Sequence, residues 1–214
     1  TETSVEPGQT IRTKPERFTI TTDRSLVSAE ARLVLADGED QVIDTVSTEV
    51  KGRQVIIKLT EELKRDAAFR LTLDSVEAED GSTLAEPYNL NFKLSGGPKV
   101  SSVSIGSSGV DPNATVVLQL DQQLKPGQDV SRFVKLTGGN GVITADNTKI
   151  YVKLANLGRC QAFSINVAKG LVSQHGIEGD SAWRLNSRTR CYTVTTIGHS
   201  AQGRPIHAHH FGSG

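Results

Sequence analysis

The sequence lacks several features that define common functional classes. Its 214 residues include no methionine, so we expect Thr1 to arise by processing or excision from a longer chain. Lysine plus arginine equals aspartate plus glutamate at 24 each, which leaves no net positive charge to attract nucleic acid or an anionic membrane. No apolar run reaches the ~18 residues that a spanning helix needs. We therefore expect no nucleic-acid partner and no membrane span.

Aromatic residues and cysteines are also scarce. Aromatics make up 5% of the chain, with a single tryptophan, too few for a row of rings on which bases or sugars could stack. Trp183 and Arg184 are predicted to be core and edge residues of a sheet rather than a ligand platform. The two cysteines form no C-x-x-C pattern and no cysteine–histidine quartet, so no structural zinc site is expected.

The chain does contain many short segments of alternating apolar and polar residues. Phe69–Leu73 and Tyr88–Leu94 both alternate with the period of two that a half-buried strand requires. Turn dipeptides such as Asp80-Gly81 separate these segments, and glycine is frequent at 20 residues. The pattern predicts short strands joined by tight turns.

Breaks in this pattern suggest the domain boundaries. Residues 1–9 show no sustained period and are predicted to be a linker. The stop Gly96-Gly97-Pro98 follows a closing strand, as expected between two domains. The expected domains span residues 10–95 and 98–196, and residues 197–214 form a separate tail.

The second half of the chain repeats the first. Several segments recur in the same order about 95 residues later, with the same alternation or turn residues. The matched pairs are 19–23 with 117–121, 55–59 with 150–154, 69–73 with 163–167, and 80–82 with 178–180. Repeats of this length with frequent turns are typical of an immunoglobulin-like (Ig-like) sandwich. The predicted fold class is all-β: two tandem Ig-like β-sandwich domains with a short C-terminal tail.

These segments resemble the bacterial Ig-like domains of S-layer and other cell-surface proteins. In those domains a strand with Phe or Leu, followed by Asp and a short turn, lies near the start, and an Asp-Gly turn precedes the last strand. The corresponding segments here are Phe18–Leu26 with Asp80-Gly81, and Val116–Leu124 with Glu178-Gly179. The resemblance implies an extracellular, periplasmic or cell-surface location, with cell-surface or cell-wall components as partners.

Residues 197–214 show a different resemblance. The pattern Gly198-x-Ser200-x-x-Gly203-Arg204-x-Ile206 resembles the segment that opens the catalytic domain of zinc metallocarboxypeptidases. In that family this turn leads into an early strand, and zinc is held by a downstream His-x-x-Glu and a later His, beside a Glu base and a substrate-binding Arg. No such motif follows the turn before Gly214. The resemblance therefore assigns structural markers only, and zinc is expected in a downstream domain. A linker or vector-derived tail is the alternative.

The two cysteines bear on the cellular compartment of the protein. Cys160 and Cys191 both fall at predicted strand positions of the second domain. A disulfide between them would stabilise the domain by roughly 3–4 kcal/mol on the chain-entropy model, and it would place the protein outside the cytosol. Two reduced cysteines buried in the core are the alternative.

Other candidate ligands are weaker. His207 and His209 would share one face of a strand, a spacing that can chelate a transition metal, but a third ligand is missing and an exposed strand is the expected alternative. Carboxylates such as Asp80 and Asp129 stand at turns, where Asp bonds the backbone, and without an Asp-x-Asp-x-Asp loop no calcium site is expected. We predict no catalytic, metal or cofactor-binding residue in this chain.

Together these features predict a non-catalytic accessory or spacer region of an extracellular or cell-surface zinc carboxypeptidase, which positions a downstream peptidase domain. The alternative is a cell-surface adhesion or stalk module with no enzyme attached. A carbohydrate- or cell-wall-binding module is a third hypothesis, disfavoured by the low aromatic content.

Overall fold

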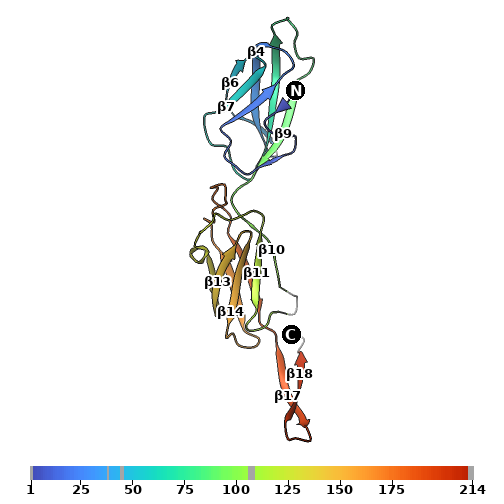
Figure 1. The fold of residues 1–214 in the computed structure, drawn as a ribbon, viewed down its shortest axis with the longest axis vertical. Helices are drawn as coiled ribbons and strands as arrows, with labels where there is room; N and C mark the ends of the chain where they lie inside the picture. The colour runs from blue at the N-terminus through green and yellow to red at the C-terminus, as the bar shows by residue number, and fades with distance from the viewer. Residues whose placement is uncertain (1, 38, 44–45, 106–108, 212–214) are drawn as a thin grey trace. The chain divides into compact units, whose positions relative to one another are not determined.

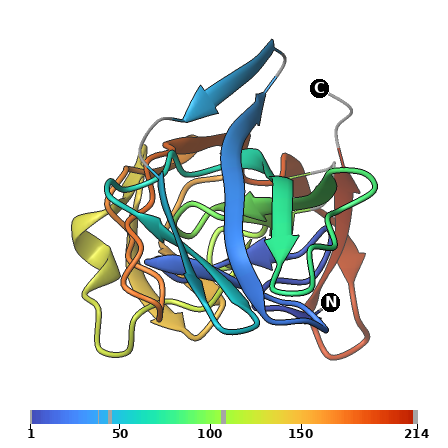
Figure 2. The same ribbon diagram turned by 90° about the horizontal axis from the view of Figure 1, so that it is seen from above.

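The computed structural model describes residues 2–37, 39–43, 46–105 and 109–211, and these form β-strands joined by turns (Figure 1). The one helix among them is a short 3-10 turn, η1 (Val130–Arg132), yellow in Figure 2. The chain divides into two compact units, Thr1–Gly96 and Gly97–Gly214, and each has its own apolar core. The predicted all-β fold is confirmed.

The first unit is a sandwich of two sheets. One sheet has the strand order β1-β3-β7-β6, and the other has the order β2-β9-β8-β4-β5. All pairs are antiparallel except β2 with β9, which is parallel. The strands are β1 (Glu2–Thr3), β2 (Thr10–Ile11), β3 (Arg17–Thr21), β4 (Leu26–Asp37), β5 (Glu39–Ile43), β6 (Val46–Lys51), β7 (Gln54–Leu59), β8 (Ala67–Ala78) and β9 (Tyr88–Leu94).

Alternation along the strands fills the core of the first unit. In β9, Leu90, Phe92 and Leu94 are buried, and the residues between them are exposed. The Phe92 ring lies 4.9 Å from Phe18 and 5.5 Å from Phe69, measured between ring centroids. Because β3 carries Phe18 in one sheet and β8 carries Phe69 in the other, Phe92 connects the two layers.

The prediction of a linker over residues 1–9 is wrong for the described residues 2–9. Glu2 and Thr3 pair with Thr21 and Ile20 of β3. Val5 is 7% exposed and belongs to the core of the first unit. The sequence pattern does not predict β1 because a two-residue strand is too short to show a period. Its partner strand, β3, also lies many residues further along the chain.

The second unit is also a two-sheet sandwich, and all its ladders are antiparallel. One sheet has the order β10-β11-β14-β13, and the other has the order β12-β15-β16. Apolar residues of both sheets, among them Leu118, Ile150 and Ile165, are fully buried between them. The strands are β10 (Val100–Val103), β11 (Thr115–Leu120), β12 (Val134–Thr137), β13 (Asn140–Asp146), β14 (Lys149–Ala155), β15 (Ala162–Val167) and β16 (Trp183–Arg188).

Strand order defines both units as Ig-like. If β10 to β16 are lettered A to G in chain order, the two sheets read A-B-E-D and C-F-G, the order of a constant-type Ig domain. The first unit has the same A-B-E-D sheet in β1-β3-β7-β6, and β5 adds a strand beside the equivalent of C. The strand segments predicted to repeat fall on equivalent strands: β3 with β11, β7 with β14, and β8 with β15.

The last two strands form a separate antiparallel ribbon, β17 (Tyr192–His199) with β18 (Pro205–Phe211). In the described part of the chain neither strand joins a sandwich sheet. The expected end of the second domain at residue 196 falls inside β17, so the tail begins earlier than predicted. Pairing with β18 extends the strand past that point, and no strand among the described residues of the first unit is equivalent to β18.

The predicted boundary glycines each belong to a different unit. Gly96 donates its backbone N–H to Asp66 Oδ1 at 2.8 Å, within the first unit. Gly97 lies directly against the backbone of Glu178 and Gly179, within the second unit. A Cβ atom at position 97 would overlap Gly179 N. Glycine at position 97 is therefore required by close packing of two main chains.

We expect Gly97→Ala to lower the free energy of unfolding of the second unit by about 2–3 kcal/mol, because two backbone segments must separate to admit the methyl group. Urea denaturation followed by the fluorescence of Trp183, the chain's single tryptophan, measures this unit. Gly198→Ala is the matched control, since a Cβ there would meet nothing within 4 Å. Equal stability of both variants would contradict the role given to Gly97.

Candidate functional site

Ser200, Gly203 and Arg204 form the tight turn that joins β17 to β18, and Gly198 and Ile206 pair next to it. Ser200 N donates to Arg204 O at 2.8 Å, and Gly203 N donates to Ser200 O at 2.8 Å. Arg204 N donates to Ser200 Oγ at 3.2 Å. Gly203 has φ of +75°, a left-handed conformation that favours glycine. The geometry of the turn therefore accounts for serine at position 200 and glycine at position 203. The Ser200 hydroxyl accepts a hydrogen bond within the turn.

The same ribbon exposes large apolar side chains. Ile197 is 65% exposed and Ile206 is 46% exposed. Ile197 lies at a β-bulge between Thr196 and Gly198, while Ile206 pairs with Gly198. Outward-facing isoleucines on a two-stranded ribbon are typical of a surface that another element covers.

The histidine pair His207 and His209, whose spacing could chelate a metal but which was not predicted to do so, is only partly described. His207 lies on β18, and its Nδ1 is 3.3 Å from Thr196 Oγ1. The side chain of His209 lies outside the described residues. His175 and Glu178 have the spacing His-x-x-Glu, yet they precede the turn and sit in an exposed loop. Among the described residues no group of three or more potential ligands is arranged to hold a metal ion.

The predicted disulfide is confirmed. Cys160 and Cys191 are bonded, with Cα atoms 4.6 Å apart. Their predicted strand positions are wrong: Cys160 lies in the turn between β14 and β15, at φ of +54°, and Cys191 lies between β16 and β17. The bond therefore links a loop of the sandwich to the base of the ribbon.

Hydrogen bonds reinforce this attachment. Thr189 is fully buried; its hydroxyl donates to Gly158 O at 2.5 Å and accepts from Gln161 N at 2.9 Å. Thr189 also forms a parallel bridge with Val110. The segment leading into β17 is thus held on the sandwich by backbone, side-chain and covalent contacts.

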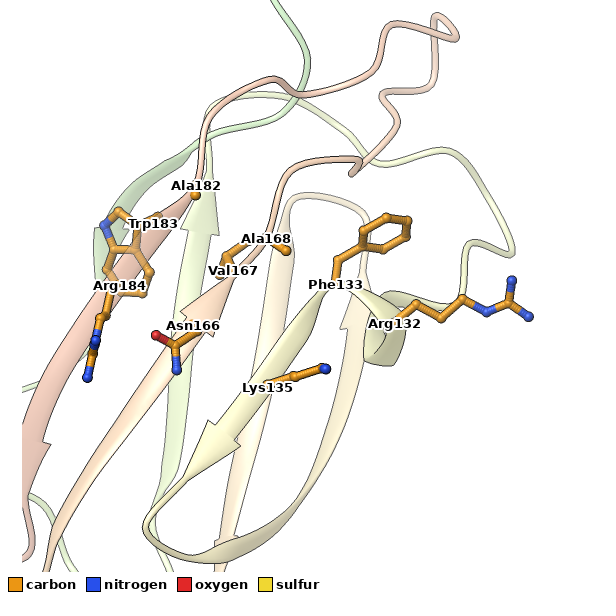
Figure 3. Close-up of a pocket in the computed structure, with 9 residues that line it drawn as sticks. All are labelled: Arg132, Phe133, Lys135, Asn166, Val167, Ala168, Ala182, Trp183 and Arg184. Atoms are coloured by element: carbon orange, nitrogen blue, oxygen red, sulfur yellow. The ribbon is translucent and has the colours of Figure 1, made fainter.

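A pocket of about 450 Å³ opens at one end of the β12-β15-β16 sheet (Figure 3). Phe133 precedes β12, Val167 ends β15 and Trp183 begins β16, so antiparallel pairing brings them to the same end. Trp183 packs against the core while remaining partly exposed. It is therefore a core residue, as predicted, that also lines a pocket.

Polar and cationic side chains border this pocket. Lys135 pairs with Asn166, and Asn166 pairs with Arg184, so their side chains share the outer face of the sheet. Figure 3 shows Asn166 between the two cations. The amide of Asn166 donates to Thr137 Oγ1 at 3.1 Å. Sequence reasoning missed this row because its members come from three strands, and only the register aligns them.

Arg132 reaches the pocket from η1, whose N-cap is Asp129. Ser131 donates both its backbone N–H and its hydroxyl to Asp129 Oδ1, at 3.1 and 2.6 Å. These bonds, the hydroxyl first, and the nearby Arg132 hold the pKa of Asp129 below its ordinary value of 3.8. Asp129 is thus the turn residue that the sequence predicted.

We expect Asp129→Asn to make the second unit less sensitive to acid. The depressed pKa means that the carboxylate stabilises the fold above the unfolded-state pKa, and that this contribution is lost as pH falls through the folded-state pKa. Between about pH 7 and about pH 3, stability should therefore fall less in Asp129→Asn than in the unaltered protein. Urea denaturation followed by Trp183 measures this. Asp146→Asn, an exposed carboxylate on β13, is the control, and an equal change in both variants would contradict the capping role.

No protein-family model and no curated protein matches the sequence. Several solved structures are similar, among them the following three. The I9–I11 tandem of titin has a TM-score of 0.41 at 8% identity, covering 91% of this chain and 68% of that one. The N-terminal part of the bacterial S-layer protein SbsC has a TM-score of 0.33 at 11% identity, covering 89% and 45%. The titin A168–A169 structure has a TM-score of 0.29 at 8% identity, covering 89% and 98%.

The class of protein rests on the strand order. Both units have the sheets of an Ig-like sandwich, so the chain is a tandem Ig-like protein with a disulfide-anchored C-terminal ribbon. No helix among the described residues is long and apolar enough to cross a membrane.

Proposed function

We propose that the two Ig-like units are a non-catalytic accessory module that carries a zinc carboxypeptidase domain outside the cytosol, and that β17 and β18 are the first strands of that domain. The observation that carries this proposal is the ribbon. Ser200, Gly203 and Arg204 close its turn by hydrogen bonds, and Gly198 pairs with Ile206 beside that turn. The resemblance to metallocarboxypeptidases implies such a turn before an early strand of the catalytic domain.

A two-stranded ribbon such as β17 with β18 gains stability from neighbouring strands and from a covering layer. A two-stranded hairpin is marginally stable alone in water, and the described residues provide no further strand beside β17 or β18. Ile197 and Ile206 remain exposed on it. Further strands and a covering layer would pair its edges and bury these side chains, as in the sheet of a larger domain.

The disulfide supports a location outside the cytosol. Disulfides persist in oxidising compartments and are rare in the cytosol, and Cys160–Cys191 joins the sandwich to the base of the ribbon. Such an attachment would hold a following domain close to the second unit. Extracellular, periplasmic or cell-surface exposure is therefore part of the proposal.

The test begins with the gene beyond the codon for Gly214. We expect it to encode a His-x-x-Glu motif soon afterwards, and the longer protein to bind zinc and release C-terminal residues from peptides until a chelator removes the metal. Further Ig-like repeats in that position would instead support an adhesion or stalk module.

Two truncations of the longer protein locate the start of the catalytic domain. A chain beginning at Tyr192 retains β17 and β18, whereas a chain beginning after Phe211 lacks both. The first should fold and hydrolyse peptides; the second should lose activity and thermal stability because its sheet lacks two strands. Equal activity of the two would remove the ribbon from the peptidase.

A further inference from the structure

The outer face of the β12-β15-β16 sheet is basic. The three strands read VKLT, AFSINV and WRLNSR, and none contains an aspartate or glutamate. Lys135 and Arg184 are exposed on this face, on either side of Asn166. With neighbouring strands about 4.8 Å apart, the two cations start from positions roughly 10 Å apart across the sheet.

The equivalent sheet of the first unit is different. There Arg32 pairs with Asp74 at 3.0 Å, and Arg70 pairs with Asp40. Within the described residues, Lys135 and Arg184 have no such carboxylate partner; Arg184 Nε donates only to the neutral Asn186, at 2.9 Å. The third cation at the pocket, Arg132, is 3.3 Å from Asp129. The second unit therefore keeps two uncompensated cations beside a pocket, as an anionic ligand requires.

The pocket also offers surfaces for sugar rings. Trp183 and Phe133 provide apolar ring surface, and Asn166 provides an amide that can bond to hydroxyl groups. Its volume of about 450 Å³ lies in the range of small-ligand sites. An apolar wall with a few convergent polar groups and two cations fits a ring that carries both hydroxyls and an acidic group.

We infer that this end of the β12-β15-β16 sheet binds an acidic polysaccharide, with carboxylate or sulfate groups at Lys135 and Arg184 on the outer face and one sugar ring in the pocket that the exposed part of Trp183 lines. The two cations favour a ligand that carries negative charge. Single-stranded nucleic acid binds along several successive aromatic side chains, whereas this pocket has one indole, that of Trp183, which favours a glycan. This inference does not depend on a downstream peptidase, because every residue in it belongs to the second unit.

Trp183 is the chain's single tryptophan, so its fluorescence reports directly on the pocket. The 214-residue protein is titrated with oligogalacturonate (carboxylated), a heparin oligosaccharide (sulfated), maltohexaose (neutral) and an oligothymidylate of similar charge. We expect a saturable change with at least one acidic glycan and none with maltohexaose. The two acidic probes separate carboxylate from sulfate recognition.

Matched variants assign the site. The double variant Lys135→Gln/Arg184→Gln should weaken binding at least tenfold and reduce its dependence on salt. The control Arg12→Gln/Lys93→Gln removes the same charge from exposed positions of the first unit and should change affinity less than twofold. Circular dichroism confirms that each variant is folded. Equal weakening in both doubles, tighter binding of the oligothymidylate, or no binding of either acidic glycan would each overturn the inference.

Discussion

Replacing Phe92 with alanine is expected to lower the free energy of unfolding of the first unit by about 3–5 kcal/mol. The ring is 1% exposed and lies between Phe18, from the opposite sheet, and Phe69, from the adjacent strand. Two hydrogen-bonded sheets cannot close freely on the space that the ring leaves. The cost therefore combines lost apolar burial with a persistent cavity.

Thermal unfolding followed by calorimetry and circular dichroism measures this change. Phe92→Leu keeps most of the volume and should cost less than about 1.5 kcal/mol. Val42→Ala, at a side chain that is 51% exposed, should change stability by no more than about 0.5 kcal/mol. A loss below about 1 kcal/mol for Phe92→Ala would show that the core relaxes around the deletion, contrary to the role given to this ring.

Replacing both Cys160 and Cys191 with serine is expected to cost the second unit about 3–4 kcal/mol. The bond closes a loop between residues separated by 31 positions, and chain entropy for a loop of that length gives this magnitude. The loop encloses β15 and β16. Without the bond, the unfolded chain gains freedom and the base of the ribbon keeps only its hydrogen bonds to the sandwich.

Trp183 fluorescence during urea denaturation measures this loss, since Trp183 lies inside the closed loop. Dithiothreitol should destabilise the unaltered protein by a similar amount and leave the double serine variant unchanged. Hydrogen exchange at the Thr189 and Arg190 amides, which bond to Gln161 O and Val110 O, should accelerate in the variant. Equal stability of the oxidised and reduced proteins would show that the bond contributes nothing to folding.

Local patterns in the sequence were sufficient to predict the fold class. The alternating segments Phe69–Leu73 and Tyr88–Leu94 lie in β8 and β9, and their phenylalanine and leucine side chains are buried. A period of two needs only neighbouring residues to be visible. The repeat then followed from strand order, because equivalent strands carry similar patterns in both units.

Features that depend on distant partners were missed. Residues 2–9 join the first sandwich through pairing with β3 and burial of Val5, a short contact with no period of its own. The sequence predicts the Cys160–Cys191 pair but puts both residues in strands, whereas Cys160 lies in a turn and Cys191 lies in the segment between β16 and β17. The positions of such residues depend on how the rest of the chain packs around them.

By itself the sequence determined that the chain is all-β, that it repeats and that its turns hold Gly and Asp, because each of these is set by neighbours along the chain. Only the tertiary structure aligned Lys135, Asn166 and Arg184 into one row and brought Trp183 to the end of that row. Lys135, Asn166 and Arg184 lie on three different strands. Strand register, which depends on the packing of a whole sheet, decides which residues of those strands meet.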